Sequence, residues 1–130
     1  MSGKRFLLDT NDIIDFLQGR NDLKDKFLSS EYMAVPHIAT GELYYGAELS
    51  NNSAKNLKII KKFLDSFDIL SSDDITSTFY AKIKKELKIR GNPIPENDIW
   101  ISALALQHDL ILATKDKHMQ LVDKLTVEIW

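Results

Sequence analysis

The chain has 130 residues, of which 44% are hydrophobic and 28% are charged, a composition typical of a globular protein and not of a disordered chain. Its formal net charge of −2 lacks the Lys and Arg excess of many nucleic-acid-binding domains, and its lack of cysteine excludes disulfides, thiolate catalysis and cysteine-ligated zinc. Because Asp9 interrupts the first apolar run and no apolar segment is long enough to span a bilayer, we expect a cytoplasmic protein without a signal peptide.

Short apolar runs alternate with amphipathic segments, and this alternation predicts strands and helices in turn. In chain order we expect a strand over Lys4–Leu8, a helix over Asn11–Gln18, a strand over Tyr32–Pro36, helices over His37–Leu49 and Ala54–Ser66, a strand over Phe67–Leu70, helices over Asp73–Arg90 and Glu96–His108, and strands over Leu110–Thr114 and Leu125–Ile129. The predicted fold class is α/β, with a mainly parallel sheet of about five short strands covered by helices on both faces.

Four acidic residues that are far apart in the sequence are expected at one edge of this sheet. Asp9 follows the first predicted strand and Asp116 comes just after the fourth, whereas Glu42 and Asp98 lie near the beginnings of helices. Parallel sheets bind ligands at the carboxyl ends of their strands, where this topology can gather all four. Clustered carboxylates repel one another, and a hard divalent cation such as Mg²⁺ or Mn²⁺ relieves that repulsion. The chemistry this favours is metal-assisted phosphodiester hydrolysis.

Each acid also has a purely structural interpretation, which stays open. Asp9 could cap the following helix, Asp98 could be an ordinary first-turn acid, and Asp116 could be a turn residue. Glu42 is harder to explain in this way, because it lies in the small and apolar segment ATGELYYGA, where an unpaired acid is costly. The structural interpretations must all hold together, which weakens them as a set.

Four segments carry a resemblance to a known family: LLDTND, ATGELYYGA, PENDIWISALAL and LATKDKHM. In this order and spacing they resemble the signature segments of PIN domains, and specifically of VapC-type toxins of type II toxin–antitoxin pairs. The resemblance spans nearly the whole chain and implies a single PIN domain over residues 1–130 with a PIN-like three-layer α/β/α fold. It further implies a Mg²⁺-dependent endoribonuclease, with Mn²⁺ as an alternative ion, that forms a homodimer and is neutralised by a VapB-type antitoxin.

The resemblance also implies roles for individual residues. The family's catalytic acids fall on Asp9, Glu42, Asp98 and Asp116. The three aspartates are expected to hold the metal, whereas Glu42 either completes its shell or positions the attacking water. Two further polar residues match supporting positions of the family, namely Asn11 and Thr114.

Four further residues lie within or beside these segments. Lys115 and Lys117 flank Asp116 and are the candidate contacts to RNA phosphates. Asp12 stands where an apolar residue is commoner in the family, and we interpret it as a charge at the N-terminus of a helix. His118 is interpreted as a turn residue that could contact a phosphate.

Two other functions are alternatives to a nuclease, a phosphatase and an inactive scaffold. A phosphatase of the haloacid dehalogenase type needs a second Asp two residues after the first, where this chain has Asn11. The main alternative is a catalytically inactive PIN-like scaffold that binds RNA or a protein partner. Trp100 is expected in a contact with the antitoxin or with a second copy of the chain.

Overall fold

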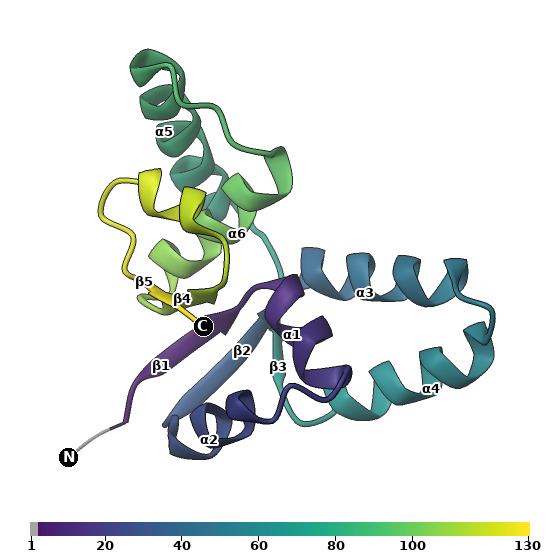
Figure 1. Ribbon diagram of the computed structural model, residues 1–130. Coiled ribbons are helices and arrows are strands. Elements are labelled where there is room, and N and C mark those ends of the chain that lie inside the picture. Colours follow the sequence, from purple (N-terminus) through teal and green to yellow (C-terminus); the bar gives the residue numbers. More distant parts are fainter. Residues whose placement is uncertain (1–2) are drawn as a thin grey trace.

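The structure, a computed structural model, describes residues 3–130 and is built around a five-stranded sheet with helices on both faces (Figure 1). The strands are β1 (Arg5–Leu8), β2 (Tyr32–Pro36), β3 (Asp68–Leu70), β4 (Ile111–Thr114) and β5 (Val127–Ile129). The helices are α1 (Thr10–Leu17), α2 (Asp22–Ser29), α3 (His37–Leu49), α4 (Ser53–Leu64), α5 (Asp74–Arg90), α6 (Glu96–Gln107) and the 3₁₀ helix η1 (Lys117–Leu121). All strand pairs are parallel, in the order β3-β2-β1-β4-β5, so the predicted fold class is confirmed.

Alternate residues of β1 face opposite layers, as the two-residue period of a strand requires. Phe6 and Leu8 belong to the apolar core that the sheet forms with α1, α2, α3 and α4. Leu7 faces the other way, into a core that includes Ile101 and Leu104 of α6. A further apolar cluster joins α5 to α6. The central strand is therefore covered on both sides, which produces the three layers.

Two elements of the structure were not predicted from the sequence. Helix α2 and the 3₁₀ helix η1 each present few apolar residues, so neither has a helical period long enough to recognise. Leu23 nevertheless lies fully buried beneath α2, and Met119 lies fully buried beneath η1. Strand β2 and helix α3 have the predicted bounds, whereas β5 begins at Val127 and α4 ends at Leu64, each two residues inside its prediction.

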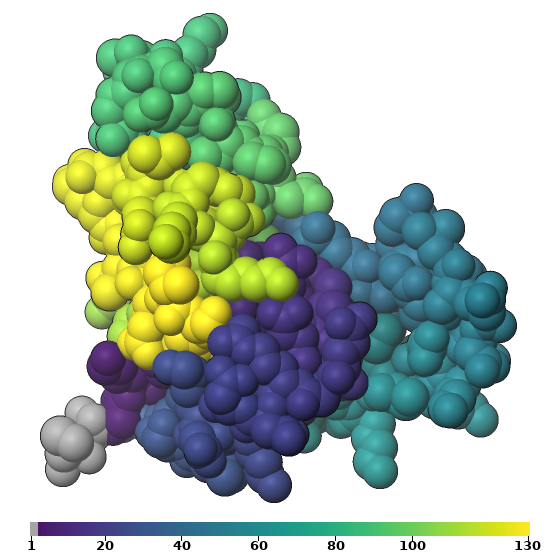
Figure 2. Space-filling view, in the orientation of Figure 1, coloured from purple at the N-terminus to yellow at the C-terminus, as the bar shows by residue number. Residues whose placement is uncertain are grey.

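The pairing of β1 with β4 decides what lies at the carboxyl edge of the sheet. Leu8 is aligned with Ala113, and the backbone N–H of Asp9 donates to the Ala113 carbonyl at 3.0 Å. Asp9 and Thr114 therefore leave neighbouring strands side by side. Helix α3 begins at the same edge, directly after β2, and projects with α4 as a hairpin away from the rest of the molecule (Figures 1 and 2).

A helix that crosses a bilayer must be long and predominantly apolar. Within residues 3–130, no helix is at once long enough and apolar enough to cross a membrane.

Candidate active site

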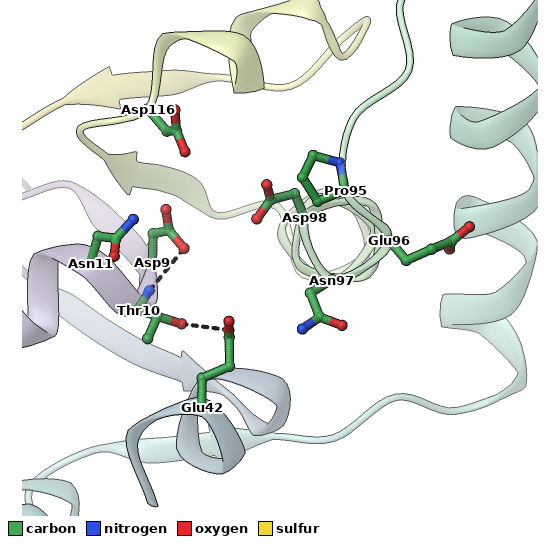
Figure 3. Close-up of a pocket in the computed structure, with 9 residues that line it drawn as sticks. All are labelled: Asp9, Thr10, Asn11, Glu42, Pro95, Glu96, Asn97, Asp98 and Asp116. Atoms are coloured by element: carbon green, nitrogen blue, oxygen red, sulfur yellow. Dashed lines mark hydrogen bonds between the residues drawn. The ribbon is translucent and has the colours of Figure 1, made fainter. Parts of the chain in front are cut away.

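A cavity of about 400 Å³ opens at the carboxyl edge of the sheet (Figure 3). Its walls come from the β1–α1 junction, from α3, from the start of α6 and from the segment after β4. Asp9, Glu42, Asp98 and Asp116 all line it, together with Asn11. The topology thus brings together four acids that are far apart in the sequence, from Asp9 to Asp116.

Asp9 is buried and held by two hydrogen bonds. It is only 4% exposed; its Oδ1 accepts from the Thr10 backbone N–H at 2.8 Å, and its Oδ2 accepts from the Thr114 hydroxyl at 2.7 Å. Asp9 is therefore the N-cap of α1 as well as a wall of the cavity, so its structural and functional interpretations are compatible. The Thr114 hydroxyl also accepts from the Asp116 backbone N–H at 3.0 Å, which links two of the acids through one buried side chain.

The surroundings of Asp9 favour a cation beside it. Burial raises the pKa of its carboxyl above the ordinary value, and the charges of Asp98 and Asp116 raise it further. The hydrogen bonds from Thr114 and Thr10 oppose this shift by stabilising the ionised form. A positive charge in the cavity would stabilise the ionised carboxylates collectively, because each of them is repelled by the others.

Glu42 reaches the cavity from α3 and is exposed, so the cost expected from burying it in an apolar segment does not arise. Its Oε1 accepts from the Thr10 hydroxyl at 2.8 Å, as Figure 3 shows. Thr10 is therefore bonded to two of the acids, to Asp9 through its backbone and to Glu42 through its side chain. The sequence analysis did not include Thr10 in the site, although it stands between Asp9 and Asn11 in the same segment.

Asp98 and Asp116 face a histidine that the sequence analysis treated as a turn residue. His118 Nε2 lies 2.8 Å from Asp98 Oδ2, and His118 Nδ1 lies 2.9 Å from Asp116 Oδ1. These three side chains each offer one possible metal-ligating atom, and the three atoms lie within 4.8 Å of one another. The spacing of Asp116 and His118 was visible in the sequence, but the approach of Asp98 depends on how α6 packs.

Other polar residues lie in the lining of the cavity or beside it. Asn11 lines the cavity, whereas Glu96 turns away from it in Figure 3, toward Tyr80 and Lys84 of α5. The two lysines that we expect to contact RNA, Lys115 and Lys117, are exposed just outside its lining. Lys115 forms an ion pair at 3.1 Å with Asp15 of α1.

Trp100 has a partner within the chain. Its ring stacks on that of Tyr80, with centroids 4.0 Å apart and an interplanar angle of 12°. This stack fastens α6 to α5, and Trp100 remains half-buried. A contact of Trp100 with an antitoxin or a second copy stays a prediction.

Asp12 is fully buried in the first turn of α1, and neither of its carboxylate oxygens has a hydrogen-bond partner among residues 3–130. Burial raises its pKa to about 7, and the charges of Asp9 and Asp15 add to the shift. Arg20 and Lys115 oppose it. Asp12 thus occupies the predicted position at the helix N-terminus, but its raised pKa shows that burial disfavours the ionised form.

With this geometry in hand, comparison with known proteins assigns the chain to a class. The PIN domain family matches residues 6–125, so the chain belongs to the PIN domain family. It is 34% identical to Ribonuclease VapC2 of Haemophilus influenzae, over 97% of this chain and 98% of that protein. It is 30% identical to the tRNA(fMet)-specific endonuclease VapC of Shigella flexneri, over 97% and 98% of the two chains. The predicted resemblance to VapC-type PIN domains is confirmed.

Solved structures of VapBC proteins contain chains with the same fold. A chain in the crystal structure of DNA-bound VapBC from Salmonella typhimurium superposes with a TM-score of 0.90 at 25% identity, covering 98% of each chain. A chain in the structure of VapBC-1 from nontypeable Haemophilus influenzae gives a TM-score of 0.88 at 27% identity, covering 97% of this chain and 98% of that one.

The hydroxyl of Thr114 provides a first test of the site. Replacing Thr114 with Val keeps the shape of the side chain but leaves a buried Asp9 oxygen without its donor. We expect the free energy of unfolding to fall by about 1–3 kcal/mol, measured by urea denaturation at neutral pH. Thr126→Val, at an exposed threonine, is the matched control. Equal losses in both variants would contradict a special role for the Thr114 hydroxyl.

Asp12 provides a second test, through the pH dependence of stability. The unfolded chain ionises Asp12 near pH 4 and the folded chain only near pH 7, so the folded state binds more protons in this window and stability falls as the pH rises through it. We expect Asp12→Asn to raise the free energy of unfolding by about 2 kcal/mol at pH 8 and to change it little at pH 4. The control is Asp25→Asn, at an exposed acid of α2. A gain that is the same at both pH values would argue against ionisation of Asp12 as its cause.

Proposed function

We propose that this chain is a divalent-cation-dependent endoribonuclease, the toxin of a VapBC-type pair, and that it hydrolyses RNA phosphodiester bonds at the cavity described above. The observation that carries the proposal is the convergence of Asp9, Glu42, Asp98 and Asp116, from four separate segments, on one cavity. Membership of the PIN domain family and the similarity to VapC ribonucleases support the choice of RNA as substrate. A catalytically inactive scaffold is the alternative that the experiments below exclude or establish.

The donor set suits a hard divalent cation. Carboxylate oxygens dominate the lining of the cavity, and none of its lining residues is Lys or Arg. We propose that Asp9, Asp98 and Asp116 hold Mg²⁺, with Mn²⁺ as the alternative, and that Glu42 completes the shell or positions the attacking water. When bound, the cation would stabilise negative charge on the phosphate and lower the pKa of water.

The chain's own hydrogen bonds prepare these residues for such a role. Thr114 and the Thr10 backbone hold both oxygens of Asp9, so this carboxylate is oriented before any ligand arrives. Thr10 likewise holds one oxygen of Glu42, which leaves the other free to accept a hydrogen bond from water in the cavity. We propose that water attacks the phosphorus and that the bond to the 3′ oxygen breaks, which gives a 5′-phosphate and a 3′-hydroxyl.

The substrate backbone needs cations near this acidic cavity. We propose that Lys117 and Lys115 contact RNA phosphates on either side of Asp116, because both are exposed at its edge. Lys115 would exchange its ion pair with Asp15 for a phosphate. Such contacts are sensitive to salt and indifferent to base sequence. Asn11 also lines the cavity, and we propose that it is a supporting residue of the site.

The same relatives support a proposal for the biological setting. Chains with this fold occur in structures described as VapBC complexes from Salmonella typhimurium and Haemophilus influenzae. We therefore propose that a VapB-type antitoxin neutralises this chain, that the chain acts as a homodimer in the cytoplasm, and that residues 1–130 form a single PIN domain.

Cleavage of RNA tests the proposal directly. We expect purified protein to cut total RNA into discrete fragments in Mg²⁺ and to stop in EDTA. Asp98→Asn should lower the rate by about 100-fold or more, because a lost metal ligand forfeits several kcal/mol of charge stabilisation. Asp74→Asn is the matched control, since Asp74 is also a first-turn helix acid but is exposed on α5 and does not line the cavity.

The outcomes of this assay separate the alternatives. Equal cleavage by wild type and Asp98→Asn would identify a contaminating nuclease. No cleavage by a folded wild type at any Mg²⁺ or Mn²⁺ concentration would favour the inactive scaffold.

Toxicity provides a separate readout in cells. Induced expression of the wild type is expected to arrest bacterial growth, whereas Asp98→Asn at an equal protein level should not, because arrest requires RNA cleavage. Co-expression of the VapB-type partner should restore growth of the wild type. The measurement is optical density after induction, with protein levels checked by immunoblot. Arrest by both variants would contradict cleavage as the cause of toxicity.

A further inference from the structure

We propose that His118 is a positioning residue of the metal centre: it bridges Asp98 and Asp116 and sets how their free carboxylate oxygens face the cavity. This inference rests on the proposed function, because it assigns a role within that site. The ring has both nitrogens at hydrogen-bonding distance from carboxylates, with Nε2 at 2.8 Å from Asp98 Oδ2 and Nδ1 at 2.9 Å from Asp116 Oδ1. With hydrogen on both ring nitrogens, each nitrogen donates to one aspartate oxygen, and the other oxygen of each aspartate stays available for a cation.

The two aspartates need such a bridge because different elements carry them. Asp98 stands in the first turn of α6, whereas Asp116 leads into η1. Their like charges repel, and the Asp116 side chain is 41% exposed, so packing alone does not restrain it. Asp9 is also oriented by hydrogen bonds, although in its case both carboxylate oxygens accept one, from Thr10 and from Thr114. A metal site is tighter when hydrogen-bond partners orient its ligands in advance.

His118 is itself held in place by its neighbours in η1. The adjacent Met119 is fully buried in the core that contains Ile101 and Leu104 of α6. Arg90, at the end of α5, donates to the carbonyl oxygen of Leu121 at 2.5 Å. The part of the 3₁₀ turn that directly follows the histidine is therefore anchored against α6 by Met119 and against α5 by Leu121. This support explains how a residue outside the cavity lining can fix the distance between two residues inside it.

Direct ligation of a metal by His118 is the competing role, and the geometry favours the bridge. A ring nitrogen that binds a cation must give up its contact with a carboxylate, and here each nitrogen lies within 2.9 Å of a carboxylate oxygen. The two roles also differ chemically. A nitrogen ligand would shift the site from hard ions such as Mg²⁺ toward softer transition metals, whereas an oxygen-only first shell keeps the preference for hard ions.

The test is metal affinity, measured without RNA. Mn²⁺ is titrated into the full chain and free Mn²⁺ is followed by electron paramagnetic resonance. We expect His118→Ala to weaken Mn²⁺ binding by about 10–100-fold. His118→Gln, which replaces the two-nitrogen ring with a single amide, should lose less. His108→Ala, at an exposed histidine after α6, is the control and should bind as the wild type does. Urea unfolding in EDTA establishes that the variants are folded.

Each outcome has a distinct meaning. Wild-type affinity in folded His118→Ala would overturn the positioning role. A directly bonded ¹⁴N in pulsed spectra of the Mn²⁺-loaded wild type, lost in His118→Ala, would overturn the bridge in favour of ligation. No Mn²⁺ binding by the wild type would contradict the metal centre, and with it the role of His118. Normal metal binding without RNA cleavage would contradict the proposed nuclease alone and leave the role of His118 standing.

Discussion

The hydrogen bond from the Thr114 hydroxyl to Asp9 Oδ2 is the contact on which the site depends. It exists because β1 and β4 pair in parallel with Leu8 opposite Ala113, so the next residue of each strand emerges at the same edge. The same hydroxyl accepts from the Asp116 backbone and so determines where the chain goes after β4. One fully buried threonine thereby couples the strand register to the placement of two acids.

The gathered acids impose an electrostatic cost that the fold only partly offsets. Burial and neighbouring charge raise the pKa of Asp9, and hydrogen bonds from Thr10 and Thr114 oppose the shift. Behind this edge, Asp12 adds another buried carboxyl with no hydrogen-bond partner among the described residues. Perturbed pKa values of this kind are typical of functional sites, and a cation bound in the cavity would lower the electrostatic cost of the clustered carboxylates.

Support for the site comes from outside the cavity as well as from within it. Helix α5, through Arg90, and helix α6, through its apolar face, anchor the short η1 turn that carries His118. Thr10 links Asp9 of the β1–α1 junction to Glu42 of the projecting α3–α4 hairpin. Rigid elements therefore determine the spacing of side chains that come from distant segments, which is what a preorganised site requires.

The sequence by itself determined the α/β class, most of the elements and the four acids, because strand and helix periods and residues at strand ends are local properties. It did not reveal α2 or η1, since elements with few apolar residues have no recognisable period and form only when Leu23 and Met119 are buried. Only the tertiary structure decided that Glu42 is exposed, that Asp12 is buried without a partner, and that Trp100 stacks on Tyr80. The contact of His118 with Asp98 is of the same kind, because it depends on how two helices and a turn pack together, and packing is not a property of any one segment.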